Sequence, residues 1–220
     1  MSSSEISVTD INAWLPLDTI AEGLYARGYC VLPNLLPSPI VMALIHAFDK
    51  KEAELRPAEV GRGDDQQSNV FVRRDRITWL DPQDPVLAEW FDAMQVLRLA
   101  LNERLFLGLF DFECQLAHYA PGGFYRRHLD AFRGRSNRRV SLVAYLNRGW
   151  LPDQGGELAM YATEHARESF VKVTPALGTV VLFLSEEIPH EVLMASRDRY
   201  SVAGWFRVND TLDNRLDPAL

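Results

Sequence analysis

The change in hydrophobic periodicity near residue 110 constrains the fold of this chain more than any other feature of its sequence. After that point, apolar residues cluster in short β-rich segments that Gly, Pro, Asp and Asn separate. Many short strands with frequent turns are typical of an all-β sandwich or jelly roll. We expect strands at residues 113–119, 139–146, 157–161, 178–184 and 200–208.

Helical spacing characterises the first half of the chain instead. Leu17, Ile20 and Leu24 repeat at intervals of three and four residues, and Gly28 follows them as a C-cap. The same spacing continues over residues 84–105, which form the longest amphipathic segment of the sequence. We expect both helices to pack on the outside of the β core.

Shorter elements lie between these helices. Residues 29–33 predict a strand, and Ser38 is expected to N-cap another helix. The segment 57–76 begins with a polar stretch rich in turn formers, which indicates a mobile loop that could serve as a lid. The chain is therefore predicted to be a single, mainly β domain with flanking helices. Its double-stranded β-helix (jelly-roll) core would span 110–210, after an N-terminal helical and lid elaboration at 1–109.

Charge and cysteine content argue against several classes of function. The net charge is −7, whereas proteins that bind nucleic acid usually carry a basic face. Cys30 and Cys114 lie far apart and fit no metal-binding spacing, which indicates two reduced thiols. No secretory leader or long apolar run is evident in the sequence. We therefore expect a soluble, cytoplasmic protein that binds neither nucleic acid nor membrane.

His128, Asp130 and His190 form a candidate metal site. In a strand, residues i and i+2 point to the same face, so His128 and Asp130 can share one ion with a ligand from another strand. Two imidazoles and a carboxylate leave the opposite face of an octahedral ion open, as Fe(II) oxygenases require. The pattern predicts redox chemistry, although so short a motif also fits a surface pair of His128 with Asp130.

Arg199 provides a second candidate anchor. It lies nine residues beyond His190, at the start of the last expected strand. A guanidinium stays charged and makes bidentate hydrogen bonds, which suits the distal end of a dicarboxylate. Ser201 falls on the same face of that strand by alternation and is expected to assist.

The segments that carry these residues resemble one enzyme family. They are similar to the prolyl 4-hydroxylase family of 2-oxoglutarate oxygenases, most of all to bacterial enzymes related to the animal oxygen-sensing prolyl hydroxylases. The resemblance runs in order over most of residues 60–208. The matching segments are Arg-Asp-Arg-Ile-Thr-Trp at 74–79, His-Tyr-Ala-Pro-Gly-Gly-Phe-Tyr-Arg-Arg-His-Leu-Asp at 118–130, Val-Ala-Tyr-Leu-Asn at 143–147, Gly-Gly-Glu-Leu at 155–158, Pro-His-Glu-Val at 189–192 and Arg-Tyr-Ser-Val-Ala-Gly-Trp at 199–205.

This resemblance implies a dioxygenase that uses Fe(II), 2-oxoglutarate and O2, with ascorbate as a supporting reductant. Iron would be bound by His128, Asp130 and His190. The distal carboxylate of 2-oxoglutarate would pair with Arg199 and accept a hydrogen bond from Tyr145. The products would be succinate, CO2 and a prolyl residue hydroxylated at C4.

The resemblance also assigns residues around the expected iron. On the cofactor side, Tyr119 matches a tyrosine that lines the family's active site, beside Ser201. Tyr145 and Trp205 also suit plain core packing. The residues expected on the substrate side are Arg74, Asp75, Tyr125, Arg138 and Trp205.

Six arginines lie between residues 126 and 139, beside the expected iron. Such a run is usually a solvated face, but here it could steer an acidic partner surface toward the site. His118 is expected to lie off the metal, because the other three ligands already complete the set.

The resemblance points to a proline in a protein substrate, with elongation factor Tu as the first partner to test. Free proline and proline-rich peptides are weaker candidates. Two other functions stay open. An oxidative demethylase of nucleic acid would keep the iron chemistry, although the acidic charge opposes it. A non-enzymatic sensor module would bind metal or ligand without forming succinate.

Overall fold

A computed structural model of the chain describes residues 8–58, 71–131, 136–209, 211–212 and 215–216. The helices are α1 (Val8–Trp14), α2 (Leu17–Arg27), α3 (Ser38–Lys51) and α4 (Ala88–Leu105), with 3-10 turns at Glu52–Glu54, Pro85–Leu87 and Pro152–Gln154. The strands are β1 (Tyr29–Leu32), β2 (Arg56–Pro57), β3 (Arg76–Trp79), β4 (Leu109–Tyr119), β5 (Tyr125–His128), β6 (Arg138–Tyr145), β7 (Leu158–Met160), β8 (Val171–Val173), β9 (Val180–Leu184), β10 (His190–Val192), β11 (Arg199–Val208), β12 (Thr211–Leu212) and β13 (Arg215–Leu216).

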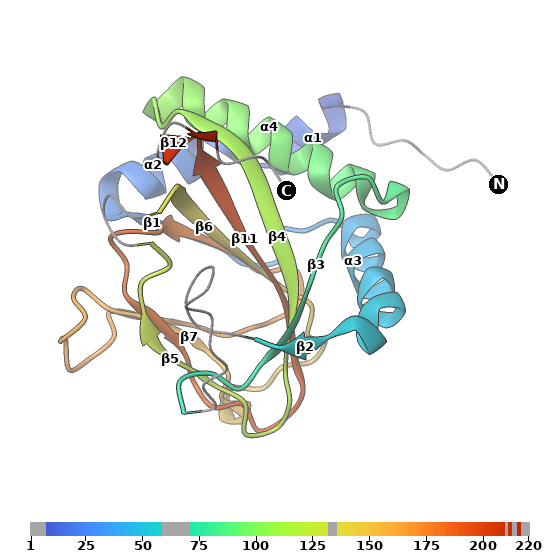
Figure 1. The fold of residues 1–220 in the computed structure, drawn as a ribbon, viewed down its shortest axis with the longest axis vertical. Helices are drawn as coiled ribbons and strands as arrows, with labels where there is room; N and C mark the ends of the chain where they lie inside the picture. Colours follow the sequence, from blue (N-terminus) through green and yellow to red (C-terminus); the bar gives the residue numbers. More distant parts are fainter. Residues whose placement is uncertain (1–7, 59–70, 132–135, 210, 213–214, 217–220) are drawn as a thin grey trace.

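Two antiparallel sheets make up the body of the protein (Figure 1). The major sheet has seven strands in the order β1-β9-β6-β11-β4-β3-β2, and the minor sheet has four in the order β5-β10-β7-β8. Both orders interleave strands that are distant in the sequence, as the predicted jelly roll requires. Strands β1 and β3, from the N-terminal half, extend the major sheet on both sides.

The major sheet separates two hydrophobic cores. Along β11, Val202 and Phe206 point toward the helices and belong to the larger core, which also contains the buried faces of α2, α3 and α4. Tyr119 and Tyr145 point the other way, into a smaller core shared with the minor sheet. Because side chains alternate along a strand, Arg199, Ser201 and Trp205 lie on this inner side as well.

Most of the expected elements are present, and two differ in detail. Gly28 ends α2 in the left-handed conformation with a φ of 77°, as expected for a C-cap. The helix predicted over 84–105 begins with a 3-10 turn, in which the Asp84 carboxylate accepts a hydrogen bond from the Val86 amide. The prediction that Ser38 caps α3 is wrong, because Ser38 is already helical. Pro37 holds the cap position without a side-chain hydrogen bond.

The strands β5, β8 and β10 have only three or four residues each, and periodicity did not predict them. Most of the expected lid, residues 59–70 within 57–76, lies outside the described residues. None of the helices in the part of the chain that the structure describes is long and apolar enough to cross a membrane.

Candidate active site

The pairing of β5 with β10 brings the three expected metal ligands together. His128 and His190 are direct partners in this pairing, so their rings lie side by side with centroids 4.3 Å apart. Asp130 Oδ1 lies 3.4 Å from Nε2 of His128 and 3.7 Å from Nε2 of His190. One potential ligand atom from each of the three residues lies within 4.8 Å of the others, which fits a shared cation.

Backbone carbonyls orient both imidazole rings. Nδ1 of His128 lies 2.8 Å from the Arg126 carbonyl oxygen, and Nδ1 of His190 lies 3.0 Å from that of Ile188. A carbonyl can only accept, so both Nδ1 atoms carry the proton and both Nε2 atoms present a lone pair toward Asp130. Burial lowers the pKa of His190 to about 4, with a further contribution from His128, so the His190 ring is neutral near pH 7. Neutral imidazoles held by their second nitrogen are typical of metal ligands.

Asp130 does not lie on the strand where the sequence placed it. Strand β5 ends at His128, and Asp130 lies in a bend that follows. The major sheet orients its carboxylate instead, through hydrogen bonds from Ser141 on β6 and Trp205 on β11. Burial alone would raise the pKa of Asp130, but His190, His128 and Ser141 together lower it well below its ordinary value. The carboxylate is therefore ionised.

Arg199 is the centre of a second cluster. Its side chain is buried, with the residue only 1% exposed. Nε donates to the Gly156 carbonyl at 2.8 Å, and Nη1 donates to Ser201 Oγ at 3.2 Å. The guanidinium carbon lies 4.9 Å from the ring centroid of Tyr119 and 5.1 Å from that of Tyr145. The structure thus brings together the four residues expected on the cofactor side.

Gly156 makes room for this arginine. Its φ of 71° lies in the left-handed region, and a Cβ atom there would lie 3.2 Å from Cδ of Arg199 and 3.0 Å from the ring of Trp150. The Gly-Gly sequence at 155–156 therefore permits the close approach that the Arg199 hydrogen bond needs.

The Arg199 cluster lacks the groups that would complete it. Of the residues that the structure describes, no carboxylate forms an ion pair with Arg199. The Tyr145 hydroxyl is buried without a hydrogen-bond partner, and burial raises its pKa to about 12, so it keeps its proton. A buried cation with no described carboxylate paired to it, beside a buried hydroxyl without a described acceptor, fits a ligand that carries a carboxylate, such as 2-oxoglutarate.

Tyr125 contacts a candidate metal ligand directly, whereas Asp75 is connected to Tyr125 through Arg73. Tyr125 stacks on His128, with centroids 3.6 Å apart and an interplanar angle of 17°. Asp75 is buried and forms a bidentate ion pair with Arg73, at 2.6 and 2.7 Å, and the Arg73 guanidinium lies over the Tyr125 ring. The Asp75 carboxylate is thus held by Arg73, and its expected role on the substrate side stays a prediction. Arg74 lies over the Phe124 ring.

Three of the described arginines of the basic run, Arg127, Arg138 and Arg139, are paired within the protein. Arg138 makes two hydrogen bonds with Glu113, at 2.7 and 2.9 Å, and its guanidinium carbon lies 3.6 Å from the ring centroid of Trp205. Arg139 pairs with Glu186 at 2.8 Å, and Arg127 donates to two backbone carbonyls. The remaining members are Arg126, which lies near Phe124, and Arg133 and Arg135, which lie outside the described residues.

A local irregularity explains why Arg138 reaches Trp205. The β6–β11 pairing runs regularly to Val140 opposite Phe206, then skips Arg139 and continues with Arg138 opposite Arg207. The extra residue reverses the alternation, so that Arg138 points to the inner side with Ser141. Sequence alternation alone places Arg138 on the helix side.

His118 lies off the metal, as expected. Its Nε2 is 2.7 Å from Asp198 Oδ1, and its ring stacks on Tyr200. Sequence analysis did not identify Ser141 and Arg73 as parts of the site. Ser141 could have been found, because it is a polar residue on the same face of an apolar strand as Tyr145.

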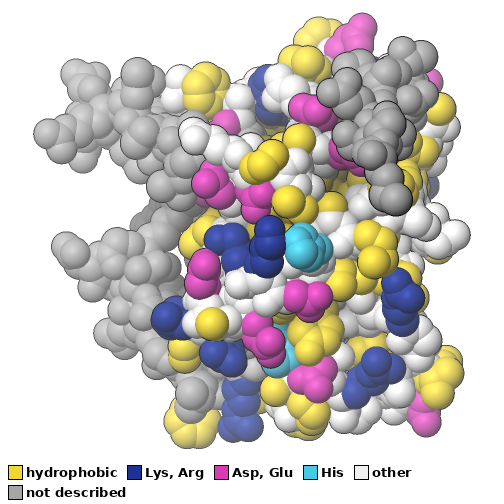
Figure 2. All heavy atoms as spheres, turned by 90° about the vertical axis from the view of Figure 1, so that its right-hand side faces the viewer, with side chains coloured by type: hydrophobic (Ala, Val, Ile, Leu, Met, Phe, Trp, Pro, Cys, Tyr) yellow, Lys and Arg dark blue, Asp and Glu magenta, His cyan; other side chains and the backbone are white. Residues whose placement is uncertain are grey.

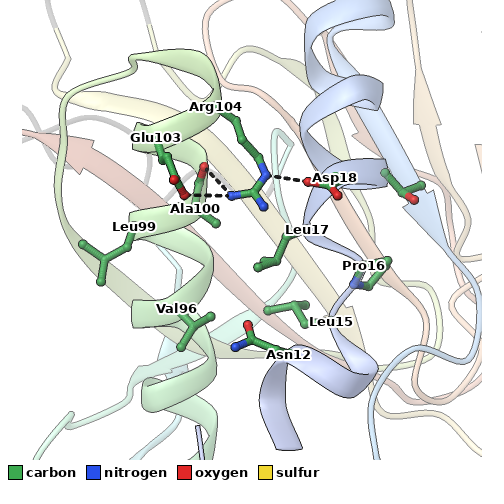
Figure 3. A pocket seen from close by; sticks show the side chains of 11 residues that line it. Asn12, Leu15, Pro16, Leu17, Asp18, Val96, Leu99, Ala100, Glu103 and Arg104 are labelled. Carbon is green, nitrogen blue, oxygen red and sulfur yellow. Dashed lines mark hydrogen bonds and ion pairs between the residues drawn. The ribbon is translucent and has the colours of Figure 1, made fainter. Parts of the chain in front are cut away.

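A cavity outside the candidate site lies in the helical layer. It has a volume of about 710 Å³ and is lined by residues of α1, α2, their connection and α4, including Leu99 and Arg104 (Figure 3). Arg104 bonds Asp18 at one end of it. This cavity belongs to the helical layer and contains none of the expected site residues.

Comparisons with known proteins agree with this geometry. A family profile described as the 2OG-Fe(II) oxygenase superfamily matches residues 114–207, which include every ligand candidate and Arg199. The crystal structure of a Pseudomonas putida prolyl-4-hydroxylase is 43% identical to this chain and superimposes with a TM-score of 0.78. The match covers 88% of this chain and all of that one. The chain belongs to the prolyl hydroxylases of the 2OG-Fe(II) oxygenase superfamily.

Other relatives are more distant. Egl nine homolog 1 of Homo sapiens is 28% identical over 149 residues, which are 63% of this chain. The chain spans only 34% to 43% of the length of the curated relatives it matches. A prolyl hydroxylase of Trichoplax adhaerens, solved with a peptide of hypoxia inducible factor, has the same fold at 24% identity. Its TM-score is 0.78, with 93% of this chain and 94% of that one covered.

Proposed function

We propose that this protein hydroxylates a prolyl residue of a protein substrate, using Fe(II), 2-oxoglutarate and O2. The observation that carries the proposal is the buried Arg199, which no described carboxylate pairs, beside the unpartnered hydroxyl of Tyr145. Together they fit the distal carboxylate of 2-oxoglutarate, while the group of His128, Asp130 and His190 fits the iron. Bound iron would supply the redox chemistry that couples decarboxylation of 2-oxoglutarate to O2 activation.

The residues of the chain would bind and orient in this scheme. Arg199 and Tyr145 would hold one end of the 2-oxoglutarate, and Tyr145 belongs to the same buried apolar cluster as Phe183, Val181 and Leu158, which would help to keep bulk water out. His128 and Asp130 are partly exposed, whereas His190 is buried. The substrate would therefore approach from the His128 side.

The prolyl substrate is proposed from the relatives. The Pseudomonas putida relative is described as a prolyl-4-hydroxylase, and the Trichoplax adhaerens structure holds a protein fragment. We assign Tyr125, Trp205 and Arg138 to the substrate side, because they surround the metal ligands. Elongation factor Tu is the first partner to test. We also propose that the protein is cytoplasmic and that ascorbate supports its activity as a reductant.

The distribution of charge argues against nucleic acid as the substrate. Basic, acidic and hydrophobic side chains are interspersed on the side that carries α3 and β3 (Figure 2). The net charge of the chain is −7, and Arg127, Arg138 and Arg139 already have partners within the protein. A phosphate backbone would need a continuous basic face.

Incubation with elongation factor Tu tests the proposal. The purified protein is supplied aerobically with Fe(II), ascorbate, 2-oxoglutarate and purified elongation factor Tu, and succinate and a single-oxygen mass gain are measured. We expect both signals, with the gain on a proline. Asp130→Ala should abolish both, whereas Asp49→Ala, an exposed aspartate on α3, should not. Succinate without a mass gain would reject elongation factor Tu alone, and the absence of succinate despite bound iron would reject the oxygenase.

A further inference from the structure

The two oxygens of the Asp130 carboxylate have different surroundings. Oδ1 faces the Nε2 atoms of both histidines, at 3.4 and 3.7 Å. Oδ2 accepts a hydrogen bond of 2.6 Å from the Ser141 hydroxyl and one of 3.0 Å from the indole Nε1 of Trp205. A carboxylate oxygen has two lone pairs in its plane, so these two donors use the full capacity of Oδ2. Only Oδ1 keeps lone pairs directed at the histidines.

We propose that Ser141 and Trp205 are positioning residues that restrict Asp130 to a metal ligand through one oxygen. This inference rests on the proposed iron site. To bind a metal through both oxygens, the carboxylate would have to give up hydrogen bonds from two buried donors, Ser141 and Trp205, which would then lose their acceptor. A one-oxygen ligand leaves one more position of the metal open for the co-substrate and O2.

Asp130 needs external support more than the histidines do. The strands β5 and β10 fix the backbone of His128 and His190, and each ring is oriented by the carbonyl two residues before it. Asp130 lies beyond the end of β5, in a bend without strand pairing. Its side chain is therefore oriented by donors from the opposite sheet, as outer partners usually orient metal ligands.

Both donors are themselves held in place. The Ser141 hydroxyl is buried and lies 2.9 Å from the hydroxyl of Ser185, which can donate to it and direct its proton to Asp130. The Trp205 ring is covered by the Arg138 guanidinium, and Arg138 is bound in turn by Glu113. Neither donor can turn away from Asp130 without breaking these contacts.

Titration of the metal-free protein with Co(II), without 2-oxoglutarate or substrate, tests the inference. The dissociation constant and the visible absorption of bound Co(II) report affinity and coordination. We expect Ser141→Ala and Trp205→Phe each to weaken Co(II) binding by about 10- to 100-fold, as for other outer partners of metal ligands. Their absorption spectra should also change, because Asp130 is then able to bind through its second oxygen. Ser141→Thr keeps the hydroxyl and should restore both values.

Two variants serve as matched controls. Ser196→Ala removes a hydroxyl that bonds the Gln154 carbonyl rather than Asp130, and Trp150→Phe removes an indole donor that bonds the Gly155 carbonyl. Both should bind Co(II) as the wild type does. Thermal unfolding of each metal-free variant confirms that it is folded before it is titrated.

The outcomes separate this inference from the function it rests on. Wild-type affinity and an unchanged spectrum in Ser141→Ala and Trp205→Phe would overturn the positioning role while leaving the iron site intact. If the wild type bound no Co(II), or bound it equally well as Asp130→Ala, the proposed iron site itself would be wrong.

Discussion

The metal end and the Arg199 end of the site differ in whether the protein supplies partners for all of their polar groups. At the metal end, each ligand has its partner: backbone carbonyls for the two histidines, and Ser141 with Trp205 for Asp130. At the other end, the Arg199 guanidinium is buried with no described carboxylate paired to it, and the Tyr145 hydroxyl has no partner.

This difference teaches how each ligand would be recruited. A small cation gains most from donors whose lone pairs are already aimed, because nothing then needs to be reorganised on binding. A dicarboxylate supplies what the second end lacks, since it neutralises a buried charge and accepts the tyrosine proton. We therefore expect removal of Arg199 or Tyr145 to weaken ligand binding with little loss of stability in the ligand-free protein.

The largest effect should come from Arg199→Met, which replaces the buried charge with an apolar side chain of similar length. Binding of 2-oxoglutarate to the Co(II) form, measured by calorimetry, should weaken by about 2–5 kcal/mol, the usual cost of removing one partner of a buried charge pair. The free energy of unfolding without ligand should fall by no more than about 1 kcal/mol, because removal of the buried charge offsets the lost hydrogen bonds. A large loss of stability with normal 2-oxoglutarate affinity would mean that Arg199 stabilises the fold and does not bind the acid.

Addition of 2-oxoglutarate should stabilise the wild type. At a free concentration 100 times its dissociation constant, a ligand specific for the folded state adds about 2.7 kcal/mol to the free energy of unfolding. Denaturant unfolding of the Co(II) form, with and without 2-oxoglutarate, measures this gain. Arg199→Met at the same concentration should gain almost nothing, and an equal gain in both proteins would place the acid elsewhere.

Tyr145→Phe should have the smallest effect. It removes a hydroxyl that has no hydrogen-bond partner among the described residues, so the ligand-free stability should stay the same or rise slightly. Binding of 2-oxoglutarate should weaken by about 0.5–1.5 kcal/mol, the usual contribution of one hydrogen bond. A loss of stability without any change in 2-oxoglutarate affinity would mean that the hydroxyl serves the core instead.

The fold class and the residues that converge could be predicted from the sequence, because both depend on local patterns. Alternation and turns predicted the main strands, and His128, Asp130, His190 and Arg199 lie in short motifs of fixed spacing. The division of the chain at residues 109 and 110 stays a prediction.

The support of Asp130 could not be predicted. Its contact with Trp205 depends on which residues of β6, β11 and the bend after β5 lie opposite one another, and on the bulge at Arg139. Strand register is set by the whole sheet and turns rather than by any local motif. The strand expected to carry both His128 and Asp130 ends at His128. The sequence did not show this end, because a strand of four residues is too short for a period to appear.

The pairing of β6 with β11 has a consequence for the size of acid that the site accepts. Ser141 and Tyr145 lie four residues apart on β6, about 13 Å along the strand, and Trp205 and Arg199 lie six apart on β11, about 20 Å. Each strand thus carries a group that holds the Asp130 carboxylate and one that is proposed to meet the far end of 2-oxoglutarate. Because hydrogen bonds hold the two strands to each other, the distance between the metal site and Arg199 is fixed. We therefore expect a shorter or longer diacid to bind less well than 2-oxoglutarate.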